Sequence, residues 1–192
     1  MPDPIRYALS PSASELTVRV FKDASSLAAR LSHDHVIQAT QLSGTFTWSE
    51  DPTTCALDVS VPVAGLLVDP PHLRARLGMG AGLSDKDKRD TDKNMRDKAQ
   101  LWASRFPVIT FRSRASAATS GGLRLTADVG VRGMSISRSV DVVVQVTDGR
   151  VTIDGGFKAR ATDFGFRPFS ALLGALKNQD EMVFYGRLVG LT

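Results

Sequence analysis

Residues 55 to 63 read Cys-Ala-Leu-Asp-Val-Ser-Val-Pro-Val, with an apolar side chain at every odd position. An alternation of this length is typical of a β-strand that turns one face to a core and the other to water. The same alternation recurs at 42–48, 123–131, 140–146 and 151–161. Because every such strand needs a partner to shield its apolar face, the series predicts an antiparallel sandwich or a closed barrel.

Shorter alternating segments add to the strand count, and tight turns join some of them. We expect further strands at 15–21, 36–40, 108–113 and 181–190. Gly121-Gly122 and Asp148-Gly149 supply the positive φ angles that two-residue hairpins require. The expected fold is therefore all-β, an antiparallel barrel of about eight strands (eight to nine) in a single domain that spans residues 1–192.

One segment has helical spacing instead. Between about residues 85 and 103, the side chains of Met95, Ala99 and Trp102 fall near one face and charged side chains occupy the other. Ser84 is a suitable N-cap, and the acidic residues after it favour a helix start. We predict one inserted helix at roughly 85–103 that caps an opening of the barrel.

Composition excludes several classes of function. The 192 residues are 42% hydrophobic, and the net charge of +4 is dispersed, with both signs interleaved between residues 85 and 93. A nucleic-acid surface needs a stripe of one sign, so we expect no nucleic-acid partner. No run approaches the roughly 18–20 apolar residues of a membrane helix, so we expect no stable membrane insertion. The start of the chain lacks a signal-peptide pattern, which predicts a cytoplasmic location, or a periplasmic one if a leader has been removed.

Catalytic motifs are missing from the sequence. No Gly-x-Ser-x-Gly elbow is present, and the single cysteine, Cys55, falls on the apolar face of a strand with no base nearby. The acidic residues Asp58, Asp128, Asp141 and Asp154 all fall on predicted outward faces. We therefore expect no catalytic residue and no cofactor.

His33 and His35 are the most distinctive polar pair. Residues two apart in an extended chain face the same way, so both imidazoles could bind one metal, with His72 as a distant third ligand. Alternatively, they and Asp34 satisfy backbone groups in a turn at the barrel mouth, or one imidazole contacts the head group of a bound lipid. Two histidines without a clear third ligand seldom make a closed site, which favours a site without metal.

Several segments resemble the YceI-like proteins, which are lipocalin-like barrels that bind polyisoprenoid or other long-chain lipids. The resemblance is carried by 101–113 (LWASRFPVITFRS), 125–134 (LTADVGVRGM) and 161–166 (ATDFGF), and it extends over nearly the whole chain. Residues 32–36 (SHDHV) and 168–176 (PFSALLGAL) resemble a branch of the family with a His-Asp-His turn and a late apolar loop. Arg132-Gly133-Met134-Ser135 departs from the commoner pattern, which has a His before the Gly and a Thr-Lys-Pro element after it.

The resemblance implies a non-catalytic binding protein that carries or sequesters an isoprenoid, a quinone or another lipid in an apolar channel. Together with the inward positions of the alternating strands, it predicts a ligand-binding set. The set consists of Phe46, Trp48, Val59, Val61, Met95, Trp102, Phe106, Ile109, Phe111, Val129, Val131, Val142, Val144, Phe157, Phe164, Phe166, Leu172, Leu173 and Phe184, with His33 and His35 at the channel mouth.

Small residues on inward faces, among them Gly44, Gly155 and Gly186, favour a hollow barrel over a filled one. The competing hypothesis is a metal-dependent enzyme or sensor centred on His33 and His35. The expected partner is a long-chain lipid, and the sequence leaves open whether the chain forms a homodimer.

Overall fold

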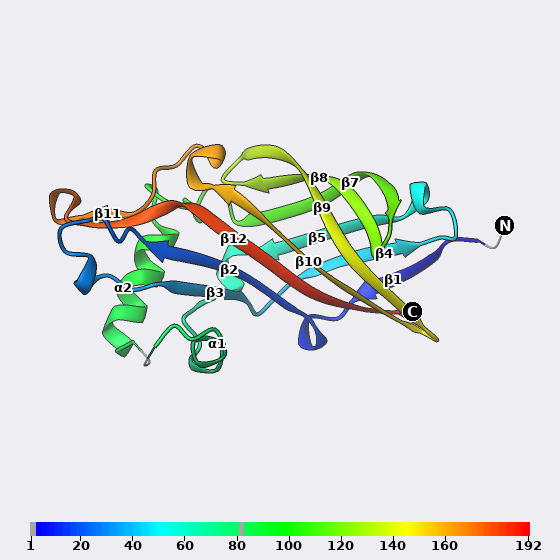
Figure 1. The fold of residues 1–192 in the computed structure, drawn as a ribbon, viewed down its shortest axis with the longest axis horizontal. Coiled ribbons are helices and arrows are strands. Elements are labelled where there is room, and N and C mark those ends of the chain that lie inside the picture. The colour runs from blue at the N-terminus through cyan, green and yellow to red at the C-terminus, as the bar shows by residue number, and fades with distance from the viewer. Residues whose placement is uncertain (1–2, 81–82) are drawn as a thin grey trace.

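Eight antiparallel strands close into a barrel in the computed structural model, which describes residues 3–80 and 83–192 (Figure 1). Around the ring, the strands are β1 (Ile5–Leu9), β4 (Ser43–Trp48), β5 (Ala56–Pro62), β7 (Val108–Thr119), β8 (Gly122–Val131), β9 (Met134–Thr147), β10 (Arg150–Arg160) and β12 (Leu176–Leu191). Pairing of Ala8 and Leu9 in β1 with Leu191 and Gly190 in β12 closes the ring. The predicted antiparallel barrel is confirmed.

A second group of strands branches from β12. Strand β2 (Glu15–Lys22) pairs with β12 between Asn178 and Arg187, on the edge that β1 occupies only at Gly190 and Leu191. Strand β3 (His35–Ala39) pairs with β2, and the short β6 (Leu66–Val68) pairs with β3. We call β2, β3 and β6 the side sheet. The two-residue β11 (Ser170–Ala171) pairs with the start of β12.

The sequence located most of the strands, including the five-residue β3, and missed three short ones. Strands β1, β6 and β11 were not predicted, and neither was the six-residue helix α1 (Pro71–Arg76). Segments of two to six residues contain few positions from which to establish a period. The turn between β9 and β10 lies at Asp148-Gly149 as predicted, whereas the turn between β7 and β8 lies at Ser120-Gly121, one residue before the predicted pair.

The predicted helix at 85–103 is too long. Helix α2 spans Asp85–Arg96, and the Ser84 side chain caps its start by accepting a hydrogen bond from the Asp87 N–H. It ends because Asp97 adopts an extended backbone, and its carboxylate accepts a hydrogen bond of 2.9 Å from the Ala99 N–H. A carboxylate at this position also opposes the helix dipole. The segment 97–106 then folds into turns. No helix among the described residues is long and apolar enough to cross a membrane.

The barrel interior contains two groups of buried apolar side chains. One surrounds Phe46 and Leu125 near the end of the barrel that β1 closes. The other surrounds Phe164 and Val131. Ile109, Phe111 and Phe157 pack against both groups. Cys55 is buried, as its position on an apolar face predicted.

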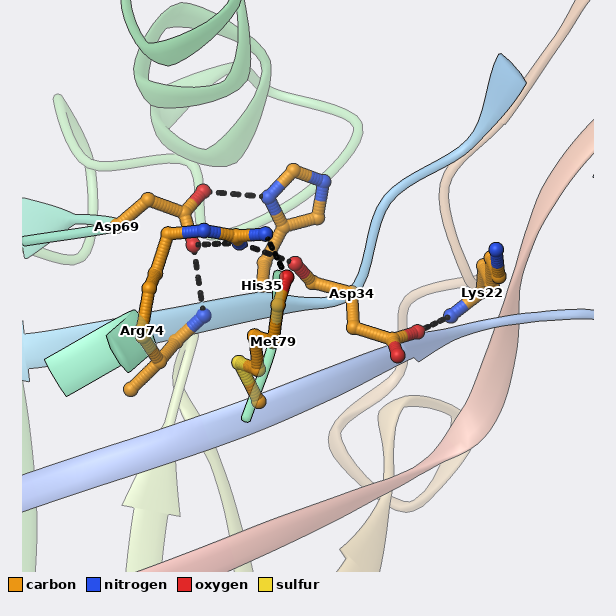
Figure 2. Close-up of polar contacts among 7 residues, drawn as sticks. Lys22, Asp34, His35, Asp69, Arg74 and Met79 are labelled. Atoms are coloured by element: carbon orange, nitrogen blue, oxygen red, sulfur yellow. Dashed lines mark hydrogen bonds and ion pairs between the residues drawn. The ribbon is translucent and has the colours of Figure 1, made fainter. Parts of the chain in front are cut away.

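A buried carboxylate joins the side sheet to α1. Asp69 directly follows β6 and is completely buried. Its Oδ1 accepts hydrogen bonds from the Val36 N–H (3.0 Å) and from Nη1 of Arg74 (2.9 Å), while its Oδ2 lies 2.6 Å from Nδ1 of His35 (Figure 2). Arg74 belongs to α1 and also donates to the Asp34 carbonyl at 2.6 Å. One carboxylate therefore connects the two ends of the 34–74 segment.

Burial alone would raise the pKa of the Asp69 carboxyl. The hydrogen bond and charge of His35, together with the hydrogen bonds from Val36 and Arg74, outweigh burial and hold the pKa of Asp69 below its ordinary value of 3.8. Asp69 is therefore ionised at neutral pH and balances the buried guanidinium of Arg74.

Replacing Asp69 with Asn should lower the free energy of unfolding by about 3–5 kcal/mol at neutral pH, because it leaves the charge of Arg74 buried without its counter-ion. Since the native pKa of Asp69 is lowered, its contribution is complete above the ordinary carboxyl pKa and is lost as the pH falls through the native value. Urea unfolding at several pH values measures the difference between the wild type and Asp69→Asn, which should shrink in acid below about pH 4.

The matched control is Asp141→Asn, which breaks the exposed ion pair with Arg124 and should change stability little. Equal destabilisation by the two substitutions would contradict a special role for the buried carboxylate.

Candidate ligand-binding channel

A cavity with a volume of about 200 Å³ lies between the side sheet, α2 and the barrel wall. Apolar side chains from the side sheet (Leu16, Val18, Val20, Ile37 and Leu66) form one side. Apolar side chains from the barrel strands, including Val61, Ile109, Val131, Met182 and Phe184, form the other. Met95 of α2 and Leu101 cover it, so the helix lies where the sequence predicted a cap.

A smaller cavity of about 100 Å³ lies deeper in the barrel. Leu16, Val61, Ile109 and Phe184 line both cavities, so the two spaces share a wall of four apolar side chains. We call the two cavities and their lining the channel.

A pair of glycines accounts for the inner cavity. Gly155 of β10 lies directly opposite Gly186 of β12, and the next inward pair along the strands is Phe157 opposite Phe184, with stacked rings 4.6 Å apart. A side chain at Gly155 would clash with Val142, whereas one at Gly186 would meet its neighbours at ordinary contact distances of 3.5 Å and more. The empty space of the smaller cavity therefore lies next to Gly186.

Polar groups gather in the larger cavity. His35, Thr91, Asn94, Gln100, Asn178 and Gln179 contribute to its lining. In the smaller cavity, the polar lining side chains are Thr17, Thr110 and Tyr185. The channel thus has an outer part with imidazole and amide groups and an inner part that is almost entirely apolar. This is the arrangement expected for a ligand with a polar head and an apolar tail.

His35 is the polar group of this lining that contacts a buried carboxylate. Because an ionised carboxylate only accepts hydrogen bonds, Asp69 fixes the proton of His35 on Nδ1. The second ring nitrogen, Nε2, is turned away from Asp69 (Figure 2) and has no hydrogen-bond partner among the described residues. The imidazole is 15% exposed and lines the larger cavity. The buried carboxylate therefore holds the ring in one orientation with a nitrogen available for a ligand.

Many residues of the expected binding set line the channel. These are His35, Val59, Val61, Met95, Ile109, Phe111, Val129, Val131, Val142, Phe157, Phe166 and Phe184. They come from β3, β5, β7, β8, β9, β10, β12, α2 and the segment after β10.

Other members of the set lie elsewhere in the interior. Phe46 is fully buried in the core group next to β1, and Trp48 and Val144 pack against that same group. Phe164 is fully buried in the second core group. At these positions the barrel is filled, so an inward-facing side chain meets other side chains instead of an open space.

The remaining members lie toward the surface. Trp102 and Phe106 pack edge to face against each other in the turns after α2, with the Arg105 guanidinium over the Trp102 ring. Leu172 and Leu173 have left-handed backbone angles and project into solvent. His33 is also exposed. No cluster of three His, Cys, Asp or Glu side chains suited to a metal occurs within residues 3–80 and 83–192.

Sequence reasoning missed two parts of the site. The inward face of β2 (Leu16, Val18 and Val20) showed the alternation, but the sequence did not reveal that this strand lies outside the main ring. Asp69 and Arg74 carried no periodic signal at all. Their pairing depends on a turn after β6 that brings α1 against β3.

Comparisons with solved structures find the same fold. BcnA of Burkholderia cenocepacia superposes with a TM-score of 0.68 and 16% sequence identity, covering 94% of this chain and 98% of that one. The YceI protein of Campylobacter jejuni gives a TM-score of 0.51 at 15% identity, covering 79% of this chain and 83% of that one. No curated protein gives a significant match.

Residues 7–188 match the YceI-like domain family. They include the barrel strands β4 to β10, the side sheet and most of β12. This span contains every residue that lines the two cavities. The chain therefore belongs to the YceI-like family.

Proposed function

We propose that this protein binds a long-chain apolar ligand, such as a polyisoprenoid, a quinone or another lipid, and carries or sequesters it without chemical change. The observation that carries the proposal is the channel, in which an almost entirely apolar inner cavity adjoins an outer cavity with polar groups. YceI-like barrels generally bind hydrophobic ligands, which supports a binding role. The apolar tail would occupy the inner cavity and the polar head the outer one.

The orientation of the ligand follows from His35. Its Nε2 atom can form a hydrogen bond to a head group, while Asp69 prevents the ring from turning. Asn94 and Gln100 from the α2 region and Asn178 from β12 supply further polar groups at the same cavity. In this arrangement the channel walls give affinity and the few polar groups give orientation.

Replacing Ile109 with Trp tests occupancy of the channel. Ile109 lines both cavities, so the larger ring should block the passage between them and abolish uptake of a long-chain ligand. Overpacking should cost about 1–3 kcal/mol of stability. Mass spectrometry of a solvent extract from the purified protein measures the bound lipid. The control, Val143→Trp, adds the same ring on the outward face of β9 and should leave the lipid content unchanged. Equal lipid in Ile109→Trp and the wild type would refute the channel.

Filling the inner cavity should select for shorter tails. Gly186→Leu adds a side chain where the neighbouring atoms leave room, so we expect a folded protein that retains short-chain ligands and loses long-chain ones. Affinities for a series of isoprenoid alcohols of increasing chain length, measured by displacement of a fluorescent lipid, check this. A uniform change at all chain lengths would show that tails do not reach Gly186.

The head-group role of His35 can be separated from that of His33. His35→Phe keeps an aromatic ring but removes both Nε2 and the Nδ1 that donates to Asp69. It should lower stability and weaken binding of a ligand with a polar head by about tenfold, the value of one hydrogen bond of about 1–1.5 kcal/mol. A pure hydrocarbon of the same length should bind as before. His33 is exposed and does not line the channel, so His33→Ala is the matched control. Equal weakening of both ligands by His35→Phe would contradict the head-group role.

A further inference from the structure

Four leucines are strongly exposed at one end of the molecule. Leu27 and Leu31 lie in the segment between β2 and β3 and are 97% and 70% exposed. Leu172 and Leu173 lie between β11 and β12 and are 66% and 109% exposed. Single exposed apolar residues are common, but four leucines on two neighbouring loops form a distinct surface. We call these four residues the leucine tip.

Backbone contacts hold the two loops together. The Ala28 N–H donates to the Ala175 carbonyl at 2.9 Å, and the Asp23 N–H donates to the Lys177 carbonyl at 2.8 Å. Figure 1 shows the 23–34 segment and β11 at the same end of the molecule, opposite the C-terminus. The leucine tip is therefore one surface built from two parts of the chain.

The exposure of Leu172 and Leu173 is imposed by the backbone. Their φ angles are 50° and 55°, in the left-handed region that residues other than Gly, Asn and Asp rarely adopt. A sequence selected only to close this loop would place glycine or asparagine there. The strained leucines project into solvent instead, which indicates that their apolar side chains have a partner outside the chain.

The two loops that carry the leucines contain only basic charged side chains. Segments 24–33 and 165–177 contain Arg30, Arg167 and Lys177 and no acidic residue. The carboxylates just outside these segments each accept a hydrogen bond within the protein, although among the described residues only Asp163 has a cationic partner. Asp23 accepts from Ser25, Asp34 from the Lys22 N–H, Asp163 from Arg138 and Asp180 from Thr162. Exposed leucines bordered by basic side chains are typical of surfaces that bind shallowly to anionic lipid.

The leucine tip also adjoins the channel. Pro168 and Phe169 precede β11, Asn178 and Gln179 lie just after the start of β12, and all four line the larger cavity. The loop that carries Leu172 and Leu173 thus begins and ends at the cavity wall. A surface that contacts the leucine tip lies next to the outer part of the channel.

We propose that the leucine tip docks the protein on an anionic bilayer surface, with the leucine side chains among the lipid head groups and Arg30, Arg167 and Lys177 near lipid phosphates. The docked state places the channel beside the membrane. The docking itself does not depend on what the channel holds, and only its use for loading rests on the proposed function.

Co-sedimentation of the full chain with vesicles tests the proposal. The wild type should bind vesicles of phosphatidylcholine mixed with phosphatidylglycerol, bind pure phosphatidylcholine more weakly, and lose the difference at high salt. The combined variant Leu27→Ser, Leu31→Ser, Leu172→Asn and Leu173→Asn should bind mixed vesicles at least about tenfold more weakly. Asn is chosen because it tolerates left-handed backbone angles, so the loop should keep its shape.

A matched control removes exposed apolar side chains elsewhere. Ile5→Thr with Val143→Thr alters exposed strand positions away from the leucine tip and should leave vesicle binding unchanged. Equal vesicle binding by the tip variant and the wild type overturns the proposal, and so does a wild type that fails to bind mixed vesicles. A wild-type dimer that the tip variant cannot form, without vesicle binding, also overturns it and assigns the surface to a second copy of the chain.

Ligand binding from detergent solution separates this proposal from the proposed function. The tip variant should retain it, because the four leucines lie outside the channel. A wild type that binds vesicles but takes up no lipid from detergent supports the docking surface and refutes the carrier. A wild type that takes up lipid from detergent but binds no vesicles supports the carrier and refutes the docking surface.

Discussion

The two-sided pairing of β12 is the constraint on which the architecture depends. With 16 residues, β12 is much longer than β1, which pairs only with Gly190 and Leu191 near its C-terminal end. The rest of that edge would expose unpaired backbone groups, and β2 covers it. Strand β2 brings β3 and β6 with it, so one end of the barrel has an additional wall. The larger cavity lies between this wall and the barrel strands, and so it follows from the unequal lengths of β1 and β12.

The contacts that stabilise this wall also prepare the site. Asp69 connects β6, the start of β3 and α1 through one buried carboxylate, and the same carboxylate fixes the His35 ring at the cavity. The Asp69–Arg74 and Asp69–His35 contacts depend on the same group, because loss of Asp69 leaves Arg74 without a counter-ion and His35 without an orienting partner. Stability and ligand orientation therefore share a single group, which explains how a mostly apolar site can include a well-oriented imidazole.

The sequence predicts which side chains face inward far better than it predicts which of them face an empty space. Phe46 and Phe111 have the same alternation, yet Phe46 is fully packed and Phe111 lines the inner cavity. The inner cavity that Phe111 lines also borders Gly155 and Gly186 on β10 and β12. The sequence placed these glycines on inward faces, but it did not show which inward side chains would lie next to them. Likewise, apolarity at Leu172 and Leu173 predicts burial, but left-handed backbone angles turn both outward. Asp69 and Arg74 meet only through tertiary contacts, so their pairing was beyond any reading of periodicity.

If the channel binds a long apolar ligand, as proposed, the ligand must reach it from a membrane. Each methylene exposed to water costs about 0.8 kcal/mol, so a chain of several isoprene units cannot cross free solution at a useful rate. Transfer is fast only if the outer cavity meets the membrane while the ligand is still partly in lipid. The position of the leucine tip next to Pro168 and Phe169, which line that cavity, satisfies this requirement. Under the proposed function, an exposed apolar surface and an apolar channel at the same end of the barrel would meet one physical need, which is to keep the ligand out of water throughout its transfer.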